Sequence, residues 1–198
     1  MRLAGRILLV FLAAVVVLGF VAWSRAAAAR RADATYHAAI PKTLLVTSAG
    51  FPADGDIPVP FTCRGTGLSP ELSWKGAPSG VKSYALVVSD FDVPSPALPL
   101  AGFTHWVVYN IPASELSIRS AIGQPELHRS AIEVGTNSAG DRAYQPPCPP
   151  LGTHRYIFRI YALDVPQLRP AQDDGAAVLE AMRGHTIAYG ELVGRAAR

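Results

Sequence analysis

Short apolar runs between segments rich in proline and glycine constrain the fold of this 198-residue chain more than any other feature. The chain has 17 Pro and 17 Gly but only 17% charged residues, a composition that favours ordered loops between short strands over a helical bundle. The runs are rich in β-branched and aromatic residues, which are typical of strands. We expect strands at 44–47, 71–75, 83–89, 105–111, 155–163 and 187–193.

Alternation within the run 155–163 predicts which of its side chains share a face. Tyr156, Phe158, Ile160 and Ala162 should point to one side of the sheet, with the intervening side chains on the other. One helix is expected near 176–182, capped by Asp173 or Asp174 and stopped by Gly184. Many strands followed by a late helix predict a mainly β fold, a sandwich of antiparallel strands with one or two peripheral helices.

The N-terminal segment is typical of a membrane-targeting helix. Residues 7–23 carry no charge and follow Arg2 and Arg6, and as a helix they would measure about 25 Å. We expect a signal anchor or signal peptide over 1–29, a linker over 30–43 and a folded domain over 44–198. The domain is then anchored in an inner membrane and lies outside the cytoplasm. The alternative is secretion after cleavage near Ala29, where three alanines offer a cleavage site.

Charge excludes nucleic acid as a partner of the folded part. Residues 36–198 hold 13 basic and 14 acidic groups, so the positive net charge of the chain comes from its N-terminus. No basic face of the kind that nucleic acid requires is expected.

Four polar side chains lie where apolar runs begin or end. Asp90 and Asp92 follow the run 83–89, His105 opens the next run, and His154 precedes the run 155–163. Taken singly, each has an ordinary structural role: an Asx-type turn for an aspartate, a backbone hydrogen bond for a histidine. Taken together, three such junctions can face one small polar cavity. Pro94 is expected to end the strand that leads into Asp90.

The order and spacing of these segments resemble the phosphatidylethanolamine-binding protein family, and within it the bacterial Raf-kinase-inhibitor-like branch. The resemblance covers roughly residues 44–195. It is carried by the segments 90–94 (Asp-Phe-Asp-Val-Pro), 105–112 (His-Trp through Asn-Ile-Pro) and 146–156 (Pro-Pro through His-Arg-Tyr). Two positions depart from the family pattern, because Phe91 replaces a proline and Pro146 replaces a glycine. Since proline has no N–H, any ligand contact made by that glycine's amide is lost here.

The resemblance implies a noncatalytic binding protein with a pocket for a phosphate or phosphoethanolamine-type headgroup. Imidazole N–H groups would donate to the anion, a carboxylate would orient them or meet an ammonium group, and prolines would form a rigid wall. It also implies a cis peptide bond before Pro94. The ligand-binding residues it implies are Asp90, Asp92, His105, Pro147, His154 and Tyr156.

The remaining expectations concern alternative functions, cofactors and the cysteines. An inhibitor of a protease or kinase is one alternative function, and a small hydrolase that uses the His and Asp side chains is another. Neither a metal nor another cofactor is expected, because the spacings typical of metal ligands are missing. Cys63 and Cys148, the two cysteines of the chain, are candidates for a disulfide in an exported domain, with two free thiols as the alternative.

Overall fold

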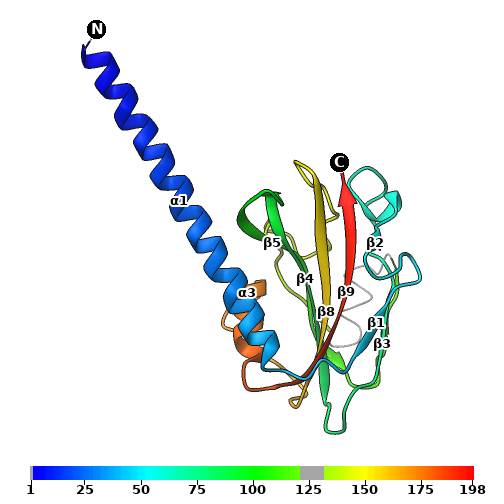
Figure 1. The fold of residues 1–198 in the computed structure, drawn as a ribbon. Helices are drawn as coiled ribbons and strands as arrows, with labels where there is room; N and C mark the ends of the chain where they lie inside the picture. Colours follow the sequence, from blue (N-terminus) through cyan, green and yellow to red (C-terminus); the bar gives the residue numbers. More distant parts are fainter. Residues whose placement is uncertain (1, 121–131) are drawn as a thin grey trace.

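Two packed β-sheets form the body of the protein in a computed structural model that describes residues 2–120 and 132–198 (Figure 1). In spatial order, the larger sheet contains β2 (Gly55–Asp56), β9 (Thr186–Ala197), β8 (Thr153–Leu163), β4 (Ser83–Ser95), β5 (Leu98–Pro112) and β7 (Glu133–Val134). The smaller sheet contains β1 (Leu45–Thr47), β3 (Leu72–Lys75) and β6 (Ser117–Ile118). All the pairings are antiparallel except that of β2 with β9.

The main core lies between the two sheets. Trp74 of β3, Leu86 of β4 and Phe158 of β8 are among its members, and all three are at most 3% exposed. A second apolar cluster covers the opposite face of the larger sheet and includes Tyr161 and Val178. Alternate side chains of β8 enter the two clusters as its period of two predicts, with Tyr156, Phe158, Ile160 and Ala162 in the first.

Helix α3 (Gly175–Met182) packs on that second face. The Asp174 carboxylate accepts hydrogen bonds from the N–H groups of Ala176 and Ala177, so Asp174 is the N-cap. Gly184, with φ of +79°, lies just beyond the end of the helix. The predicted antiparallel sandwich with peripheral helices is confirmed.

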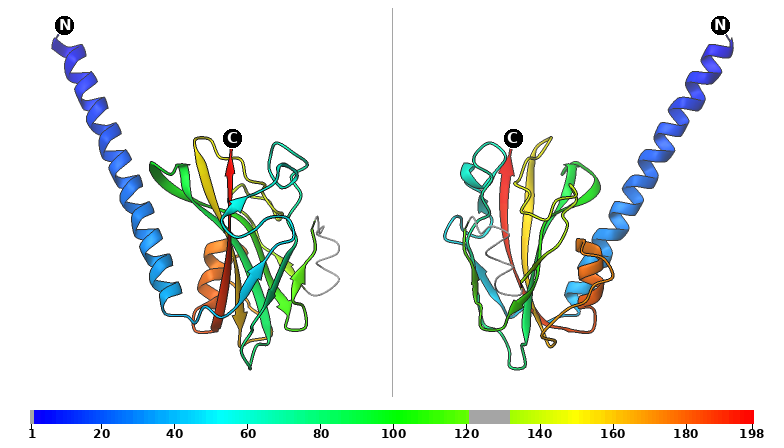
Figure 2. Two further views of the ribbon diagram at one scale, coloured as in Figure 1. Left: turned by 45° about the vertical axis from the view of Figure 1, so that its right-hand side comes forward. Right: turned by 180° about the vertical axis from the view of Figure 1, so that it is seen from behind.

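Helix α1 (Arg2–Ala38) is a single continuous helix whose residues 6–38 are long and apolar enough to cross a membrane. Its apolar half projects away from the sandwich, whereas its last turns lie beside the larger sheet and α3 (Figure 2). The segment expected to be a linker, residues 30–43, is therefore helical as far as Ala38. The alanine-rich sequence allows the helix to continue, and contacts with the sheet hold it there, notably the ion pair of Asp33 with Arg159 at 2.8 Å and the hydrogen bond of His37 with Tyr161 at 2.9 Å.

Strand β4 continues past Asp90 to Ser95 and forms a long hairpin with β5, although Pro94 was expected to end it. The pairing of β4 with β8 stops at Asp90 and Tyr156, so Pro94 has no paired residue on β8. The missing N–H of Pro94 therefore breaks no hydrogen bond between these two strands. The register of the hairpin shifts twice between Asp90 and Pro94. The peptide bond between Val93 and Pro94 is cis.

Candidate anion-binding pocket

A cavity of about 220 Å³ lies at one end of the larger sheet, between the β4–β5 hairpin, the start of β8 and the loop 145–152. Its volume is below the usual range for drug-sized ligands, so it suits a small headgroup or ion. The cavity is lined by Asp90, Val93, Phe103, His105, Gln145, Pro146, Cys148, Pro149, Pro150 and Tyr156. Of the six residues expected to bind a ligand, Asp90, His105 and Tyr156 line it.

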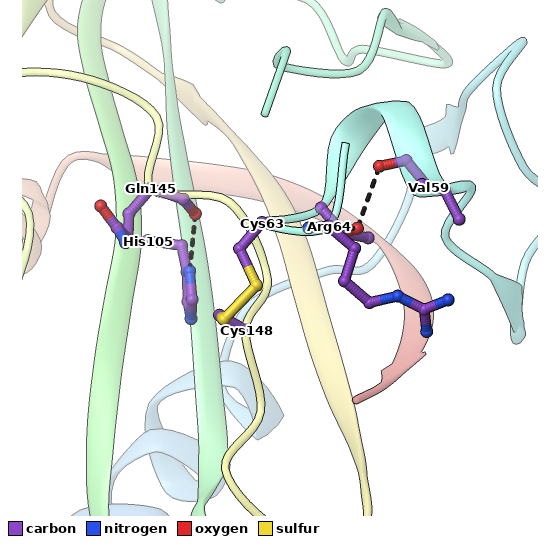
Figure 3. The surroundings of a disulfide bond; sticks show 7 residues. Val59, Cys63, Arg64, His105, Gln145 and Cys148 are labelled. Atoms are coloured by element: carbon purple, nitrogen blue, oxygen red, sulfur yellow. Dashed lines mark hydrogen bonds between the residues drawn. A yellow bond between two sulfur atoms is a disulfide. The ribbon is translucent and has the colours of Figure 1, made fainter. Parts of the chain in front are cut away.

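His105 projects from β5 and is fixed by the loop that closes the cavity (Figure 3). Its Nδ1–H donates to the Gln145 carbonyl at 2.7 Å, and the Gln145 N–H donates back to the His105 carbonyl at 2.8 Å. A carbonyl can only accept, so the ring proton of the neutral form resides on Nδ1 and Nε2 carries a lone pair. Burial lowers the pKa of His105, partly opposed by the Gln145 carbonyl and by Asp90. A neutral His105 thus presents an acceptor to the cavity and becomes a donor there only when it gains a proton.

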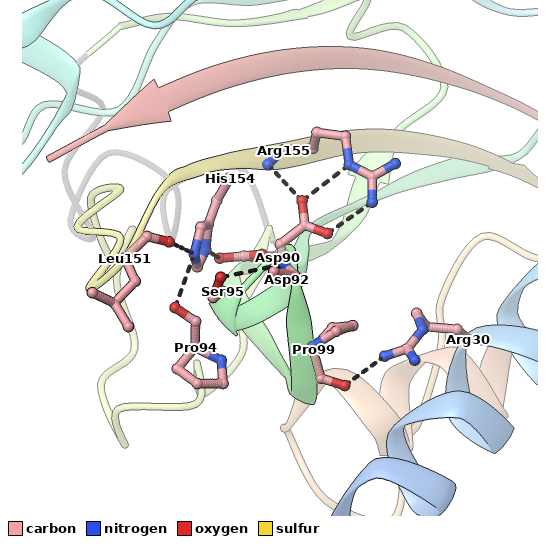
Figure 4. A network of polar contacts seen from close by, with 10 residues as sticks. Arg30, Asp90, Asp92, Pro94, Ser95, Pro99, Leu151, His154 and Arg155 are labelled. Atoms are coloured by element: carbon pink, nitrogen blue, oxygen red, sulfur yellow. Dashed lines mark hydrogen bonds and ion pairs between the residues drawn. The ribbon is translucent and has the colours of Figure 1, made fainter.

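His154 does not line the cavity, because its ring lies behind Asp90 and is fully buried (Figure 4). Its Nδ1 contacts the Asp90 carboxylate at 2.7 Å, and its Nε2 lies 3.3 Å from the Pro94 carbonyl and 3.1 Å from the Leu151 carbonyl. Nε2 must donate to these carbonyls, and a second proton must lie between Nδ1 and Asp90. The His154–Asp90 pair therefore has no net charge and joins the hairpin to the loop.

Asp92 also points away from the cavity, toward Arg155. Its carboxylate accepts hydrogen bonds from the Arg155 Nη2 at 2.7 Å, Nε at 3.0 Å and backbone N–H at 3.0 Å. Burial alone would raise the pKa of Asp92, but these hydrogen bonds hold it below its usual value. The expectation from the sequence placed Asp92 in the pocket. In the structure it neutralises Arg155 and orders the chain after Asp90.

Tyr156 of β8 is paired with Asp90 on the neighbouring strand β4 and is 1% exposed. Its ring packs edge-on against His105 with centroids 5.0 Å apart. Burial raises the pKa of its hydroxyl, with a further contribution from Asp90, so the group remains protonated at neutral pH. The hydroxyl has no hydrogen-bond partner within residues 2–120 and 132–198 and is available to a ligand.

The loop wall is rigid and poor in amide donors. Within 146–150 every residue except Cys148 is a proline, so this stretch offers a single N–H group. Cys148 is bonded to Cys63, with Cα atoms 5.4 Å apart, and the Cys63 N–H donates to the Pro147 carbonyl at 3.0 Å. Pro147 itself therefore stands behind the lining, which Pro146, Pro149 and Pro150 provide.

Sequence reasoning missed Val93, Phe103 and Gln145 as lining residues. Phe103 lies two positions before His105 on the same strand, and their rings are 4.6 Å apart, so the period of two could have found it. Gln145 acts through its backbone, for which its residue type gives no signal. Residues 2–120 and 132–198 contain no group of three or more His, Cys, Asp or Glu side chains arranged to hold a metal ion.

Comparison with known proteins places this arrangement in a family. The sequence model for phosphatidylethanolamine-binding proteins matches residues 47–197. A UPF0098 protein of Methanothermobacter thermautotrophicus is 41% identical over 143 residues, which span 71% of this chain and 89% of the relative. A UPF0098 protein of Chlamydia muridarum is 41% identical over 149 residues, 75% of this chain and 95% of the relative.

Solved structures agree with this assignment. A phosphatidylethanolamine-binding protein homologue of Chlamydia trachomatis superposes with a TM-score of 0.68 at 35% identity, covering 79% of this chain and 99% of that one. YbcL of E. coli, described as a member of the mammalian family, gives a TM-score of 0.70 at 27% identity with the same coverage. The chain belongs to the phosphatidylethanolamine-binding protein family.

Proposed function

We propose that this chain is a noncatalytic binding protein whose pocket takes up a small phosphate-type anion of the phosphoethanolamine class. The observation that carries the proposal is the pairing of charges around the cavity. The Asp90–His154 and Asp92–Arg155 pairs are each neutral, so the walls neither repel nor strongly attract an anion. His105 and the Tyr156 hydroxyl lie outside both pairs and line the cavity, where they can contact it.

Anion binding at His105 should be coupled to proton uptake. Because burial favours the neutral ring, the ligand meets a lone pair on Nε2 unless a proton arrives with it. An imidazolium would donate from Nε2 to a phosphate oxygen while Nδ1 stays bonded to Gln145. A charge-assisted bond of this kind is roughly twice as strong as a neutral one. Asp90 also lines the cavity, and its carboxylate, which already contacts His154 and the Asp92 N–H, would meet the ammonium end of an ethanolamine group.

Two of the groups in the cavity supply no nucleophile, which supports a noncatalytic role. Cys148 is held in a disulfide and supplies no thiolate. The raised pKa of Tyr156 keeps its hydroxyl protonated, so it is a donor and not a nucleophile at neutral pH. The disulfide also supports our proposal that α1 anchors the domain outside the cytoplasm, since such bonds persist in oxidising compartments.

Titration calorimetry of the full chain in detergent tests the function. Phosphoethanolamine should bind with uptake of a proton, seen as a heat that differs between buffers of different ionisation enthalpy. His105→Ala should abolish binding. Tyr156→Phe should weaken it about 10–100-fold, because a hydrogen bond to a charged group contributes about 1.5–3 kcal/mol.

His185→Ala is the matched control, because its imidazole is about half exposed and bonds Asp164 outside the cavity. This variant should bind like the wild type. Equal affinities in the wild type and in the His105 and Tyr156 variants would contradict the proposal. Inorganic phosphate as a second titrant separates recognition of the anion from recognition of the whole headgroup.

A further inference from the structure

The docked half of α1 runs along the larger sheet toward the pocket. His37 Nε2 lies 2.9 Å from the Tyr161 hydroxyl, and Asp33 pairs with Arg159, which is two residues nearer the start of β8. Arg30 then donates to the Pro99 carbonyl at 3.1 Å, close to the tip of the β4–β5 hairpin. Moving back along the helix from His37 to Arg30 therefore leads from the far end of the sandwich to its pocket end. Figures 1 and 2 show that α1, followed toward its N-terminus, runs to the end of the sandwich where the β4–β5 hairpin turns.

The apolar half of the helix begins immediately beyond that end. Ala26 and Ala27 are still buried, at 7% and 8% exposure. The uncharged run 7–23 ends three residues before Ala26, which corresponds to about 4.5 Å along a helix. Its side chains are exposed, Leu9 by 67% and Leu18 by 69%. If this run lies in a bilayer, the bilayer surface is within about one helical turn of the docked segment.

Two large apolar side chains project from the pocket end of the domain. Leu98 at the hairpin tip is 53% exposed, and Leu151 in the facing loop is 61% exposed. His154 donates to the carbonyls of both Pro94 and Leu151, so the hairpin and the loop are held together (Figure 4). The two leucines therefore belong to one rigid end of the molecule, and we call them the leucine pair.

We propose that the leucine pair rests on the surface of the same membrane that α1 enters, so that the pocket faces the lipid headgroups. Helix α1 is continuous from the apolar run to the docked segment, so the position of the apolar run in a bilayer fixes where the bilayer surface lies beside the domain. A tethered surface needs little affinity of its own, since α1 keeps it at high local concentration beside the lipid. Apolar side chains at an interface gain by entering the headgroup boundary.

One consequence rests on the proposed function. Headgroups of the leaflet beside the domain would be the ligands nearest to His105 and Tyr156, so the protein would sample the membrane it is anchored in. The contact between the leucine pair and the lipid does not require this.

Lipid quenching of site-specific fluorophores tests the orientation. Leu98→Cys, Leu151→Cys and Leu116→Cys are each labelled with an environment-sensitive dye in the full chain, with the native disulfide intact. Leu116 is the matched control, because it is 49% exposed and follows the end of β5 that lies opposite the hairpin tip. In phosphatidylcholine vesicles that contain doxyl-labelled lipid, the dyes at 98 and 151 should lose most of their emission and the dye at 116 should keep it. Equal emission at the three sites overturns the proposal.

A second variant tests whether α1 sets the orientation. Inserting about ten Gly and Ser residues after Ser24 leaves the docked segment intact but separates it from the apolar run by a flexible chain. Quenching at 98 and 151 should then fall to the level at 116, and its retention would refute the role of the rigid helix. His105→Ala should leave quenching unchanged, so this measurement and the calorimetry succeed or fail separately.

Discussion

Replacement of His154 by alanine should destabilise the protein strongly, although this side chain does not line the cavity. The Asp90 carboxylate is 2% exposed, and one of its oxygens contacts His154 Nδ1 at 2.7 Å while the other accepts from the Asp92 N–H at 2.7 Å. Removing His154 leaves this buried carboxylate with the hydrogen bond from the Asp92 N–H but without its ionic partner, and breaking a buried pair costs about 3–5 kcal/mol. The carbonyls of Pro94 and Leu151 lose their donor as well. With an m-value of about 2 kcal/mol per molar, the urea midpoint should fall by about 1.5–2.5 M.

Two comparisons isolate the buried pair. His185→Ala removes an imidazole that bonds Asp164 at 3.0 Å, but both side chains are 46% exposed, so the loss should stay below about 1 kcal/mol. The double variant Asp90→Ala with His154→Ala should cost less than the two single losses added together, by about 0.5–3 kcal/mol. The reasoning fails if His154→Ala is as mild as the His185 control, or if the double variant equals the sum.

Two further predictions follow from the pocket wall. Burial lowers the pKa of His105 below its ordinary 6.5, so the unfolded chain binds its proton more tightly than the folded one; the free energy of unfolding should therefore fall as pH drops from about 6.5 to the lowered pKa. Urea midpoints across this range should show less pH dependence in His105→Phe, and identical curves would contradict the assignment. The disulfide closes a separation of 85 residues, so the double variant Cys63→Ser with Cys148→Ser should be less stable than the wild type by up to about 4–5 kcal/mol in the same assay. Thiol titration of the unreduced, denatured wild type should detect no free thiols, and the detection of two free thiols would show that the disulfide does not form.

Local pattern predicted those parts of the fold that depend on burial along one strand or helix. The apolar run 83–89 marks the first half of β4, and alternation in β8 assigns its side chains to the two clusters. Asp174 and Gly184 flank α3 because caps depend on neighbours in the chain. Such features could be read from the sequence, because the residues that decide them are adjacent.

Features decided by distant partners could not be read in this way. Residues 30–38 look like a solvated linker, and partners far along the chain explain why they dock as helix: Arg159 pairs with Asp33, 126 residues away, and Tyr161 bonds His37. Distant partners also decide whether a histidine at a loop–strand junction faces a cavity. His154 is turned away by Asp90 and by the hairpin folded over it, whereas His105 is held toward the cavity by the Gln145 carbonyl.

If the cavity binds an anion as we propose, the proline at position 146 leaves side chains as the main donors to that anion. Where the family pattern has a glycine amide, this chain has no donor, and the Gln145 amide is already bonded to His105. Only Cys148 retains an N–H within 146–150, so backbone donors contribute less here than in a loop with glycine. His154 and Arg155 are neutralised by their aspartates. An anion in the cavity would therefore depend on the Tyr156 hydroxyl and on His105, and of these two only His105 can change its charge near neutral pH. Recognition by this pocket should be more sensitive to pH than recognition by a loop that offers amides, because its main ionic contact exists only while one buried imidazole is protonated.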